Sequence, residues 1–332
     1  MDVAAPVRVA VIFGGQNTEH AVSLKSAASV MQYLDRDRYE VVPVRITTEG
    51  RWIVGDDAAG EPDRAQSLFR AMDALRGVDV AFPVLHGPFG EDGTVQSVLE
   101  LAGVPYVGSG VLASAASMDK EFTKKILSAD GIAVADGVVL REGESADEDK
   151  SVRHLGLPVF VKPSRGGSSI GVSRVDDWAQ LDGAVAVARE ADSKILIEAA
   201  VPGREIDVGV LQMPDGDIVA SPPLEIRVAS DHGIFDYQAK YEPGIVEFLV
   251  PADLEPAETK TLQEEAVRVF RSLGCEGLLR VDYFLTPGGE LIVNEVNTMP
   301  GMTDMSQFPR MWQAAGTPYG KLLDLMIRTA LR

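Results

Sequence analysis

The sequence predicts an α/β protein that opens on a parallel sheet, and two observations predict it. Residues 7–13 form a continuous apolar run that ends in Gly14-Gly15, and residues 21–34 follow with helical spacing. Two further strand-like runs, YEVVPVRIT and DVAFPVLHG, alternate with helical stretches. Strands that alternate with helices are typical of a parallel sheet, whose ligands lie at the carboxyl ends of the strands.

Length and composition are those of a folded protein with two or three domains. The chain has 332 residues, and 45% of them are hydrophobic, which is enough for more than one core. Its net charge of −19 would repel the phosphates of nucleic acid and anionic membranes, so neither is expected as a partner. The single cysteine, Cys275, rules out an intramolecular disulfide and is expected to be a small buried hydrophobe in a reducing compartment.

The N-terminal residues indicate a cytoplasmic protein. MDVAAPVRVAVIFGG lacks the basic cluster and the long apolar core of a signal peptide. No segment approaches the ~20 apolar residues that a membrane-spanning helix needs. We therefore expect the protein in the cytoplasm, without a membrane partner.

The first glycine turn, GGQNTEH, matches no nucleotide-binding motif. It lacks the G-x-G-x-x-G spacing, and G-x-x-x-x-G-K-[ST] occurs nowhere in the chain, so a nicotinamide-dependent dehydrogenase is disfavoured. Glu19 in this turn would repel a pyrophosphate but could hold an ammonium group. The alternative is an acidic residue in the first turn of a helix, where the helix dipole favours it.

Two more candidate residues lie in this part of the chain. His86 stands at a strand end in the glycine-rich turn HGPFGEDG, where a histidine is a better functional candidate than on an apolar face. Lys120 lies near the start of a helix, where the dipole disfavours a cation, so it is a candidate for binding a ligand. A domain boundary is expected close to Lys120.

A glycine-rich loop and a lysine predict a phosphate site in the middle of the chain. The runs PVFVKP and IGVSRV flank SRGGSS, whose backbone N–H groups can surround phosphate oxygens, and Lys162 would supply a cation. The alternative is a plain mobile hairpin. Glu198 and Glu205 follow, either as acceptors for ribose hydroxyls or as ordinary strand-end carboxylates. The long polar segment EIRVASDHGIFDYQAKYEPG is expected to form a lid.

The most specific charge pattern lies in RVDYFLTPGGELIVNEVN. Its alternation and its Pro287-Gly288-Gly289 turn predict an antiparallel hairpin. If Leu285 pairs with Glu290, then Arg280 lies opposite Glu295. The chain leaves the second strand through TMPG and must turn there, so a backbone N–H could face a ligand.

On this register Asp282 lies opposite Val293, and one face of the hairpin carries Arg280, Asp282, Glu295 and Asn297. Two carboxylates and an amide oxygen are the ligands that Mg²⁺ or Mn²⁺ prefers. The alternative is a cross-strand ion pair between Arg280 and Glu295.

Seven blocks of the sequence resemble, in the same order, the D-alanine–D-alanine ligases of the ATP-grasp superfamily: GGQNTEHAVSLKSA, LHGPFGEDGT, GSGVLASAASMDK, VKPSRGGSSIGVS, DYQAKY, LLRVDYF and NEVNTMPGMTDMS. The resemblance implies an ATP-grasp architecture with an N-terminal parallel α/β domain (1–118), a central lobe (119–204) and a C-terminal lobe with metal site and lid (205–332). It also implies ATP-dependent ligation of two D-alanines through an acyl phosphate, for peptidoglycan precursor synthesis. A homodimer is expected.

The resemblance also assigns roles to the candidate residues. ATP would be bound by Lys120, Lys162, Ser169, Glu198, Val201, Glu205 and Lys240. Two Mg²⁺ (or Mn²⁺) ions would be held by Asp282, Glu295 and Asn297. The substrates would be bound or activated by Glu19, His86, Ser168, Tyr241, Arg280, Gly301 and Ser306.

Within this last group the implied roles differ. Glu19 would hold the ammonium of the first D-alanine, with help from Ser168 and Tyr241. Arg280 and the Gly301 N–H would face the reacting carboxyl oxygen. The second D-alanine would have its carboxylate on Ser306 and its amine beside His86.

Two residues depart from the family's pattern, and several rival functions remain open. Gln307 stands where some members carry an apolar residue, and Ala200 stands where bulkier residues line the adenine pocket. A ligase joining D-alanine to D-lactate is disfavoured because Tyr241 matches the peptide-forming relatives. Another ATP-grasp carboxylate–amine ligase is disfavoured by the regions of Glu19 and Ser306. A nucleotide-binding module without catalysis is disfavoured by the intact charges of the hairpin.

Overall fold

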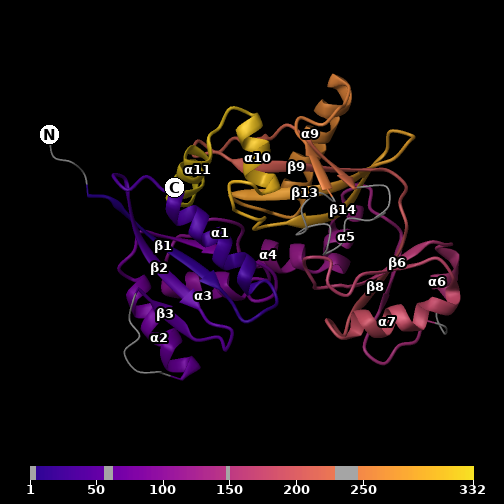
Figure 1. The fold of residues 1–332 in the computed structure, drawn as a ribbon, viewed down its shortest axis with the longest axis horizontal. Coiled ribbons are helices and arrows are strands. Elements are labelled where there is room, and N and C mark those ends of the chain that lie inside the picture. The colour runs from indigo at the N-terminus through magenta and orange to yellow at the C-terminus, as the bar shows by residue number, and fades with distance from the viewer. Residues whose placement is uncertain (1–4, 56–62, 147–149, 229–245) are drawn as a thin grey trace.

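The computed structural model describes residues 5–55, 63–146, 150–228 and 246–332, which form three sheets in three successive stretches of the chain (Figure 1). The predicted lid falls mainly in residues 229–245, outside the described residues, as do Lys240 and Tyr241. Its first four residues, 225–228, belong to a strand instead. No helix in the described ranges is long and apolar enough to cross a membrane.

The first sheet has the order β3-β2-β1-β4, with strands β1 (Val7–Gly14), β2 (Tyr39–Ile46), β3 (Trp52–Val54) and β4 (Val80–Val84). β1 runs parallel to β2 and β4, which confirms the predicted parallel sheet, and β3 is antiparallel to β2. Its helices are α1 (His20–Tyr33), α2 (Arg64–Leu75) and α3 (Thr94–Ala102). The loops that leave the carboxyl ends of β1 and β4 contain Glu19 and His86.

Two helices, α4 (Val111–Met118) and α5 (Lys120–Ala129), lead to the middle sheet. That sheet is antiparallel, in the order β5-β8-β6-β7, with strands β5 (Gly137–Leu140), β6 (Val159–Pro163), β7 (Ser173–Val175) and β8 (Ile195–Ala199). Its helical elements are α6 (Lys150–His154), the 3₁₀ turn η1 (Trp178–Gln180) and α7 (Leu181–Arg189). The glycine-rich loop connects β6 to β7.

The large sheet has the order β12-β11-β9-β13-β14, and β10 pairs with β9. Its strands are β9 (Arg204–Gln212), β10 (Ile218–Ala220), β11 (Leu224–Val228), β12 (Val246–Leu249), β13 (Leu278–Leu285) and β14 (Leu291–Asn297). Helix α9 (Pro256–Ser272) packs its buried residues Leu262, Ala266, Val269 and Phe270 into the core of this sheet. Helix α10 (Gln307–Ala314) lies close over β9, because a Cβ at Gly209 would come within 3.0 Å of the Phe308 ring.

The predicted register of the β13–β14 hairpin is wrong. Leu285 pairs with Leu291, not Glu290, and a β-bulge beside Asp282 shifts the rest of the ladder. The bulge leaves Asn294 without a partner on β13, and it could not be read from the turn residues.

As a result Arg280 lies opposite Asn297, and Asp282 lies opposite Glu295. Residues directly opposite each other project from the same face of a sheet. The two pairs are also two residues apart on β13, so all four polar side chains still share one face.

The last helix, α11 (Tyr319–Ala330), returns to the first sheet (Figure 1). Leu322 and Met326 share a core cluster with Val9 and Phe82 of the first sheet. The buried carboxylate of Asp324 accepts a hydrogen bond of 2.7 Å from the Tyr39 hydroxyl. The end of the chain therefore packs on its beginning, although the predicted division assigns it to the C-terminal lobe.

Cys275 is buried, as predicted, and burial raises the pKa of its thiol to about 11. At pH 8 only about one thiol in a thousand is then ionised, and the thiolate is the reactive form. We expect a coloured disulfide reagent to leave Cys275 unmodified in the native protein and to react with one thiol per chain after unfolding in urea. Rapid modification of the folded protein would contradict this assignment.

Candidate functional site

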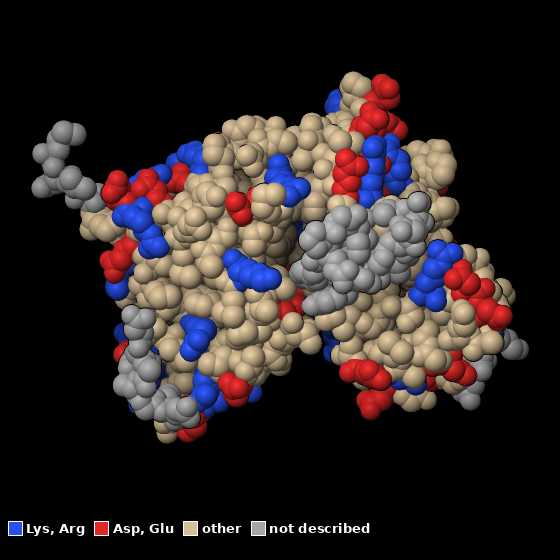
Figure 2. All heavy atoms as spheres, in the orientation of Figure 1, with Lys and Arg blue, Asp and Glu red and all other residues tan. Residues whose placement is uncertain are grey.

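Two contiguous cavities lie where the three sheets meet. The larger cavity, about 640 Å³, lies between the middle and large sheets, and the smaller cavity, about 520 Å³, lies between the first and large sheets. Both are lined by Lys120, Gly166, Gly167, Arg280 and Glu295, so one opens into the other. Figure 2 shows this face of the molecule hollowed between the first and middle sheets.

The structure brings the predicted residues that it describes to these cavities. The larger cavity is lined by Lys120, Lys162, Ser169, Glu198, Val201, Glu205, Arg280, Asp282 and Glu295. The smaller cavity is lined by Glu19, His86, Ser168, Asn297, Gly301 and Ser306. Residues from all three sheets thus meet around one continuous space.

Three lysines lie close together beside the larger cavity, and two of them, Lys120 and Lys162, line it. Lys120 Nζ lies 3.3 Å from Glu295 Oε2 and donates to the Gly166 carbonyl at 2.9 Å. Lys124 and Lys162 both form ion pairs with the buried carboxylate of Glu198. Burial lowers the pKa of Lys124, Glu198 opposes that shift, and the charges of Lys162 and Lys120 lower it further.

Three ammonium groups thus lie close together in a chain whose net charge is −19. A local cluster of cations suits an anionic ligand. Lys124 was not among the residues predicted from the sequence. It lies one helical turn after Lys120 on α5, and that spacing, which puts both on one helix face, is the signal that could have found it.

The glycine-rich loop between β6 and β7 reaches across to the first sheet. Ser168 and Ser169 have φ angles of +52° and +57°, in the left-handed region. The Ser168 hydroxyl donates to Glu19 Oε1. A Cβ at Gly167 would lie 2.8 Å from Glu19 Oε2, and one at Gly87 would lie closer still, so glycines permit the close approach on both sides of this carboxylate.

His86 is buried at the end of β4 with both ring nitrogens engaged. Nδ1 lies 2.9 Å from the Met299 carbonyl oxygen, and Nε2 lies 3.0 Å from Ser26 Oγ. Because a carbonyl only accepts, Nδ1 carries the proton and Nε2 accepts from the serine hydroxyl. Burial lowers the pKa of His86 while Glu19 opposes the shift, so the imidazole is neutral.

Glu91, another buried residue of this turn, was also missed in the sequence. Its carboxylate accepts hydrogen bonds from the N–H of Gly87 at 2.6 Å and from the N–H of Met299 at 3.2 Å. The Asn297 amide nitrogen, with its amide oriented to satisfy its neighbours, lies 2.8 Å from the same side chain. Burial, with Glu19 nearby, raises the pKa of Glu91 to about 8. Glu91 therefore ties the turn after β4 to the turn after β14.

Arg280 lies at the junction of the two cavities. Its guanidinium donates to both oxygens of Asp282, at 2.6 and 2.7 Å, and lies 3.4 Å from Asp207 Oδ2. It also donates to Gln307 Oε1 at 3.1 Å, and the Gln307 amide donates to Asp207 at 2.9 Å. The alternative of a cross-strand pair with Glu295 does not occur, because Glu295 faces Lys120 instead. Gln307, a departure from the family's pattern, has a definite place in this network.

The acidic side chains around Arg280 suit a divalent cation. Burial raises the pKa of Asp207 well above its ordinary value, and Asp282, Glu205 and Glu295 raise it further, whereas Arg280 lowers it. The guanidinium of Arg280 thus stands beside the acidic side chains of Asp207, Asp282 and Glu295, and hard cations prefer such oxygen ligands. Asp282 and Glu295 are turned to Arg280 and Lys120, and among the described residues no three Asp, Glu, His or Cys side chains converge on one point. The oxygen donors fit Mg²⁺ or Mn²⁺, and the predicted ligand set remains a prediction.

Comparison with known proteins identifies the family. A model of the D-ala D-ala ligase N-terminus matches residues 8–109, and a model of the D-ala D-ala ligase C-terminus matches residues 126–328. The chain belongs to the D-alanine–D-alanine ligase family. Over 98% of its length it is 51% identical to a D-alanine–D-alanine ligase of Nocardia farcinica, of which it covers 97%. It is 48% identical to one of Mycobacterium avium, with 100% of this chain and 98% of that one covered.

Solved structures of the same family confirm the predicted ATP-grasp fold. The VanG D-Ala:D-Ser ligase from Enterococcus faecalis superposes with a TM-score of 0.84 at 35% identity, over 98% of this chain and 100% of that one. The D-alanine–D-alanine ligase from Bacillus anthracis complexed with ATP gives a TM-score of 0.81 at 32% identity, over 98% of each chain. The family's fold therefore extends over nearly the whole chain.

Proposed function

We propose that this protein uses ATP to join two D-alanines into D-alanyl-D-alanine, for peptidoglycan precursor synthesis. One observation carries the proposal above all. The large cavity, which lies beside the lysine cluster, opens directly into a second cavity lined by Glu19, Arg280 and Ser306. The first arrangement suits a nucleotide triphosphate, and the second suits an amino acid. Their junction at Arg280 is where a phosphoryl group and a carboxylate would meet.

The larger cavity would hold ATP with its phosphates at the lysine cluster. Lys120 and Lys162 would contact phosphate oxygens, while Glu198 holds the ammonium groups of Lys162 and Lys124 in place. N–H groups of the glycine-rich loop, with Ser169, would close over the phosphates. Val201 and Glu205, farther along the same cavity, would lie along the adenine and ribose. Lys240, outside the described residues, would reach the γ-phosphate.

The first D-alanine would bind through its ammonium to Glu19, which the Ser168 hydroxyl orients. Tyr241 would extend this hydrogen-bonded chain. An oxygen of the D-alanine carboxylate attacks the γ-phosphorus, the bond from that phosphorus to the bridging oxygen breaks, and ADP leaves. The product is an acyl phosphate, whose carbonyl carbon is a far better electrophile than a carboxylate.

The second D-alanine would lie with its carboxylate near Ser306, and its amine attacks the acyl carbon. The tetrahedral oxyanion that forms needs donors already in position, and Arg280 with the Gly301 N–H would supply them. Inorganic phosphate then leaves with the transferred oxygen, and the amine loses its proton. This amine would lie beside neutral His86, whose Nδ1 donates to the Met299 carbonyl at 2.9 Å.

Two Mg²⁺ (or Mn²⁺) ions would be held by Asp282, Glu295 and Asn297, on one face of the β13–β14 hairpin. Bound there, they neutralise phosphate charge during phosphoryl transfer. The crowding of acidic side chains around Arg280 supports this assignment.

Glu295→Gln tests the metal assignment. It removes one anionic oxygen donor, so we expect turnover to need roughly ten times more Mg²⁺ for half-maximal rate. The measurement is a Mg²⁺ titration at fixed ATP and D-alanine. Glu290→Gln, on the exposed turn of the same hairpin, is the matched control and should titrate as the wild type does. An unchanged titration for Glu295→Gln would remove this residue from the metal site.

The acyl-phosphate path is tested with D-alanine whose carboxylate carries ¹⁸O. The oxygen that attacks the γ-phosphorus stays with the phosphate when the amine displaces it. We therefore expect one ¹⁸O in each inorganic phosphate released, as measured by mass spectrometry. Dipeptide formed together with unlabelled phosphate would contradict the path.

We also propose that the protein works in the cytoplasm as a homodimer. The need for ATP supports the location.

Leu101 on α3 and Leu112 on α4, each 82% exposed on neighbouring helices, support a contact between copies there. Sedimentation of the purified protein tests the dimer, and Leu112→Glu should shift the equilibrium to monomer.

A further inference from the structure

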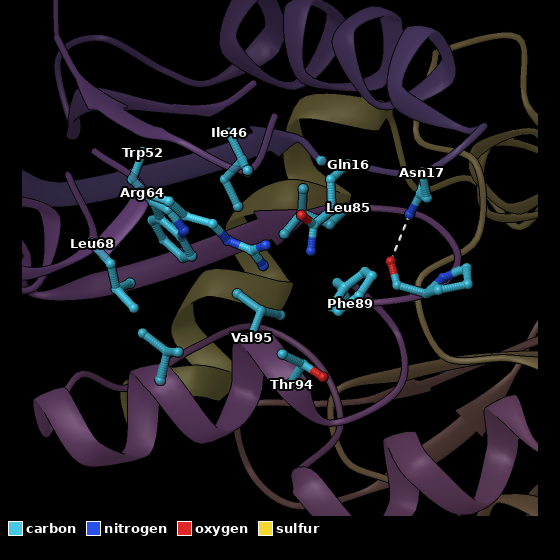
Figure 3. A pocket seen from close by; sticks show the side chains of 15 residues that line it. Gln16, Asn17, Ile46, Trp52, Arg64, Leu68, Leu85, Phe89, Thr94 and Val95 are labelled. Atoms are coloured by element: carbon cyan, nitrogen blue, oxygen red, sulfur yellow. Dashed lines mark hydrogen bonds between the residues drawn. The ribbon is translucent and has the colours of Figure 1, made fainter. Parts of the chain in front are cut away.

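A third cavity, of about 120 Å³, lies beside the first sheet, and none of its lining residues lines the two site cavities. Its walls are mainly apolar, from Ile46, Trp52, Leu68, Leu85, Val95 and Val98. Figure 3 shows the labelled side chains among them, those of Ile46, Trp52, Leu68, Leu85 and Val95, converging on the cavity from β2, β3, α2, the loop after β4 and α3. The mechanism proposed above does not use this space.

One cation reaches into this apolar cavity. Arg64 is the first residue of α2, and its guanidinium extends among the lining side chains toward Gln16 (Figure 3). A positive charge at a helix N-terminus opposes the helix dipole, so the helix gives no reason for an arginine there. Among the described residues none forms an ion pair or hydrogen bond with the side chain of Arg64, whose backbone carbonyl accepts from the Ser67 hydroxyl.

Gly50 makes room for this arrangement. A Cβ at Gly50 would lie 2.6 Å from Gln16 Oε1 and 3.0 Å from Arg64 Nε. Its φ of +80° also disfavours other residues. The glycine thus lets a guanidinium and an amide stand together over an apolar cavity.

We propose that this cavity binds a small carboxylate with an apolar body. The planar guanidinium of Arg64 matches a carboxylate with two parallel hydrogen bonds, and the apolar walls would take the hydrocarbon part. A cavity of about 150 Å³ lined by Leu, Ile and Phe holds benzene. A space of about 120 Å³ that is open at Arg64 therefore suits one small ring or a short branched chain.

The cavity shares a wall with the loops that carry Glu19 and His86. Asn17 Nδ2 donates to the carbonyl oxygens of His86 at 2.7 Å and Pro88 at 2.6 Å, and its Oδ1 accepts from the Glu19 N–H at 2.9 Å. Asn17 and Pro88 line the cavity. A carboxylate bound there acts through Asn17 on the backbone that positions Glu19, and so changes the affinity for D-alanine. This second step rests on the proposed function of Glu19.

Fluorescence of Trp52 tests the binding directly, without any turnover. Benzoate and isovalerate are the probes, and benzyl alcohol is the neutral counterpart of benzoate. We expect a saturable change in the wild-type protein that Trp52→Phe abolishes, although Trp178 and Trp312 remain. We expect weaker binding of benzyl alcohol. No saturable signal with either carboxylate, or equal affinity for benzyl alcohol, would overturn the proposal.

Two matched variants separate Arg64 from general charge. Arg64→Gln should weaken carboxylate binding roughly tenfold or more, because it removes a charge-assisted pair. Arg70→Gln removes another exposed arginine of α2 that does not line the cavity, and it should bind as the wild type does. Both should unfold at the wild-type temperature. Equal affinity in the two variants would overturn the role of Arg64.

Repeating the titration with saturating D-alanine tests the coupling. Linkage requires that each ligand change the affinity of the other by the same factor. That factor is typically between about 5-fold and 150-fold. An unchanged benzoate affinity would overturn the coupling. The titration without D-alanine still decides the binding site if the proposed ligase activity is wrong.

Discussion

Arg280→Ala should abolish dipeptide synthesis while leaving ATP binding within about threefold of the wild type. Removing one donor to a developing oxyanion typically costs on the order of 10²–10³ in rate, and Arg280 is proposed to be that donor. The fall should appear in kcat, because the interaction is made in the transition state. The measurements are steady-state dipeptide formation and calorimetric titration with ATP.

The controls for Arg280 must separate chemistry from folding. The alanine variant leaves the carboxylates of Asp282 and Asp207 without their cation, and breaking a buried pair costs on the order of 3–5 kcal/mol of stability. Thermal unfolding of each variant is therefore needed. Arg280→Lys keeps one charge but loses the planar fork, so it should recover stability more than rate. Synthesis by Arg280→Ala within tenfold of the wild type would remove Arg280 from the mechanism.

Lys162→Met should raise the KM for ATP by roughly 10- to 100-fold, because a charge-assisted contact to phosphate contributes about 1.5–3 kcal/mol. The protein should stay folded, since Glu198 keeps its ion pair with Lys124 and methionine fills a similar volume. The readout is ATP affinity by calorimetry together with KM from phosphate release.

Lys125→Met is the matched control for Lys162. Lys125 is an exposed lysine on α5 that pairs with Glu121 and lines neither site cavity. Its loss should leave the KM for ATP unchanged. If both variants bound ATP equally well, the phosphates would not lie at the lysine cluster.

The sequence was sufficient for the fold class and for the shared face of the hairpin, because alternation along a strand fixes which side chains share a side. It was not sufficient for the register. The bulge that leaves Asn294 unpaired depends on how two strands meet, and the Pro-Gly-Gly turn carries no information about it.

Other residues became visible only through contacts between distant segments. Glu91 accepts hydrogen bonds from the N–H groups of Gly87 and Met299, and Met299 lies 208 residues after Glu91 in the chain. Asp207 enters the network of Arg280 because β9 lies beside β13. Likewise the packing of α11 on the first sheet is a tertiary contact that its helical spacing does not specify. Lys124 is different, since its spacing from Lys120 was already available in the sequence.

The most direct test of the account is coupled phosphate release and product mass, measured with ATP, Mg²⁺ and each substrate set in turn. With D-alanine alone we expect one phosphate for each D-alanyl-D-alanine, and none with L-alanine. Phosphate release only when D-lactate or D-serine is added would contradict the proposed acceptor. No release under any of these conditions would contradict ligation itself.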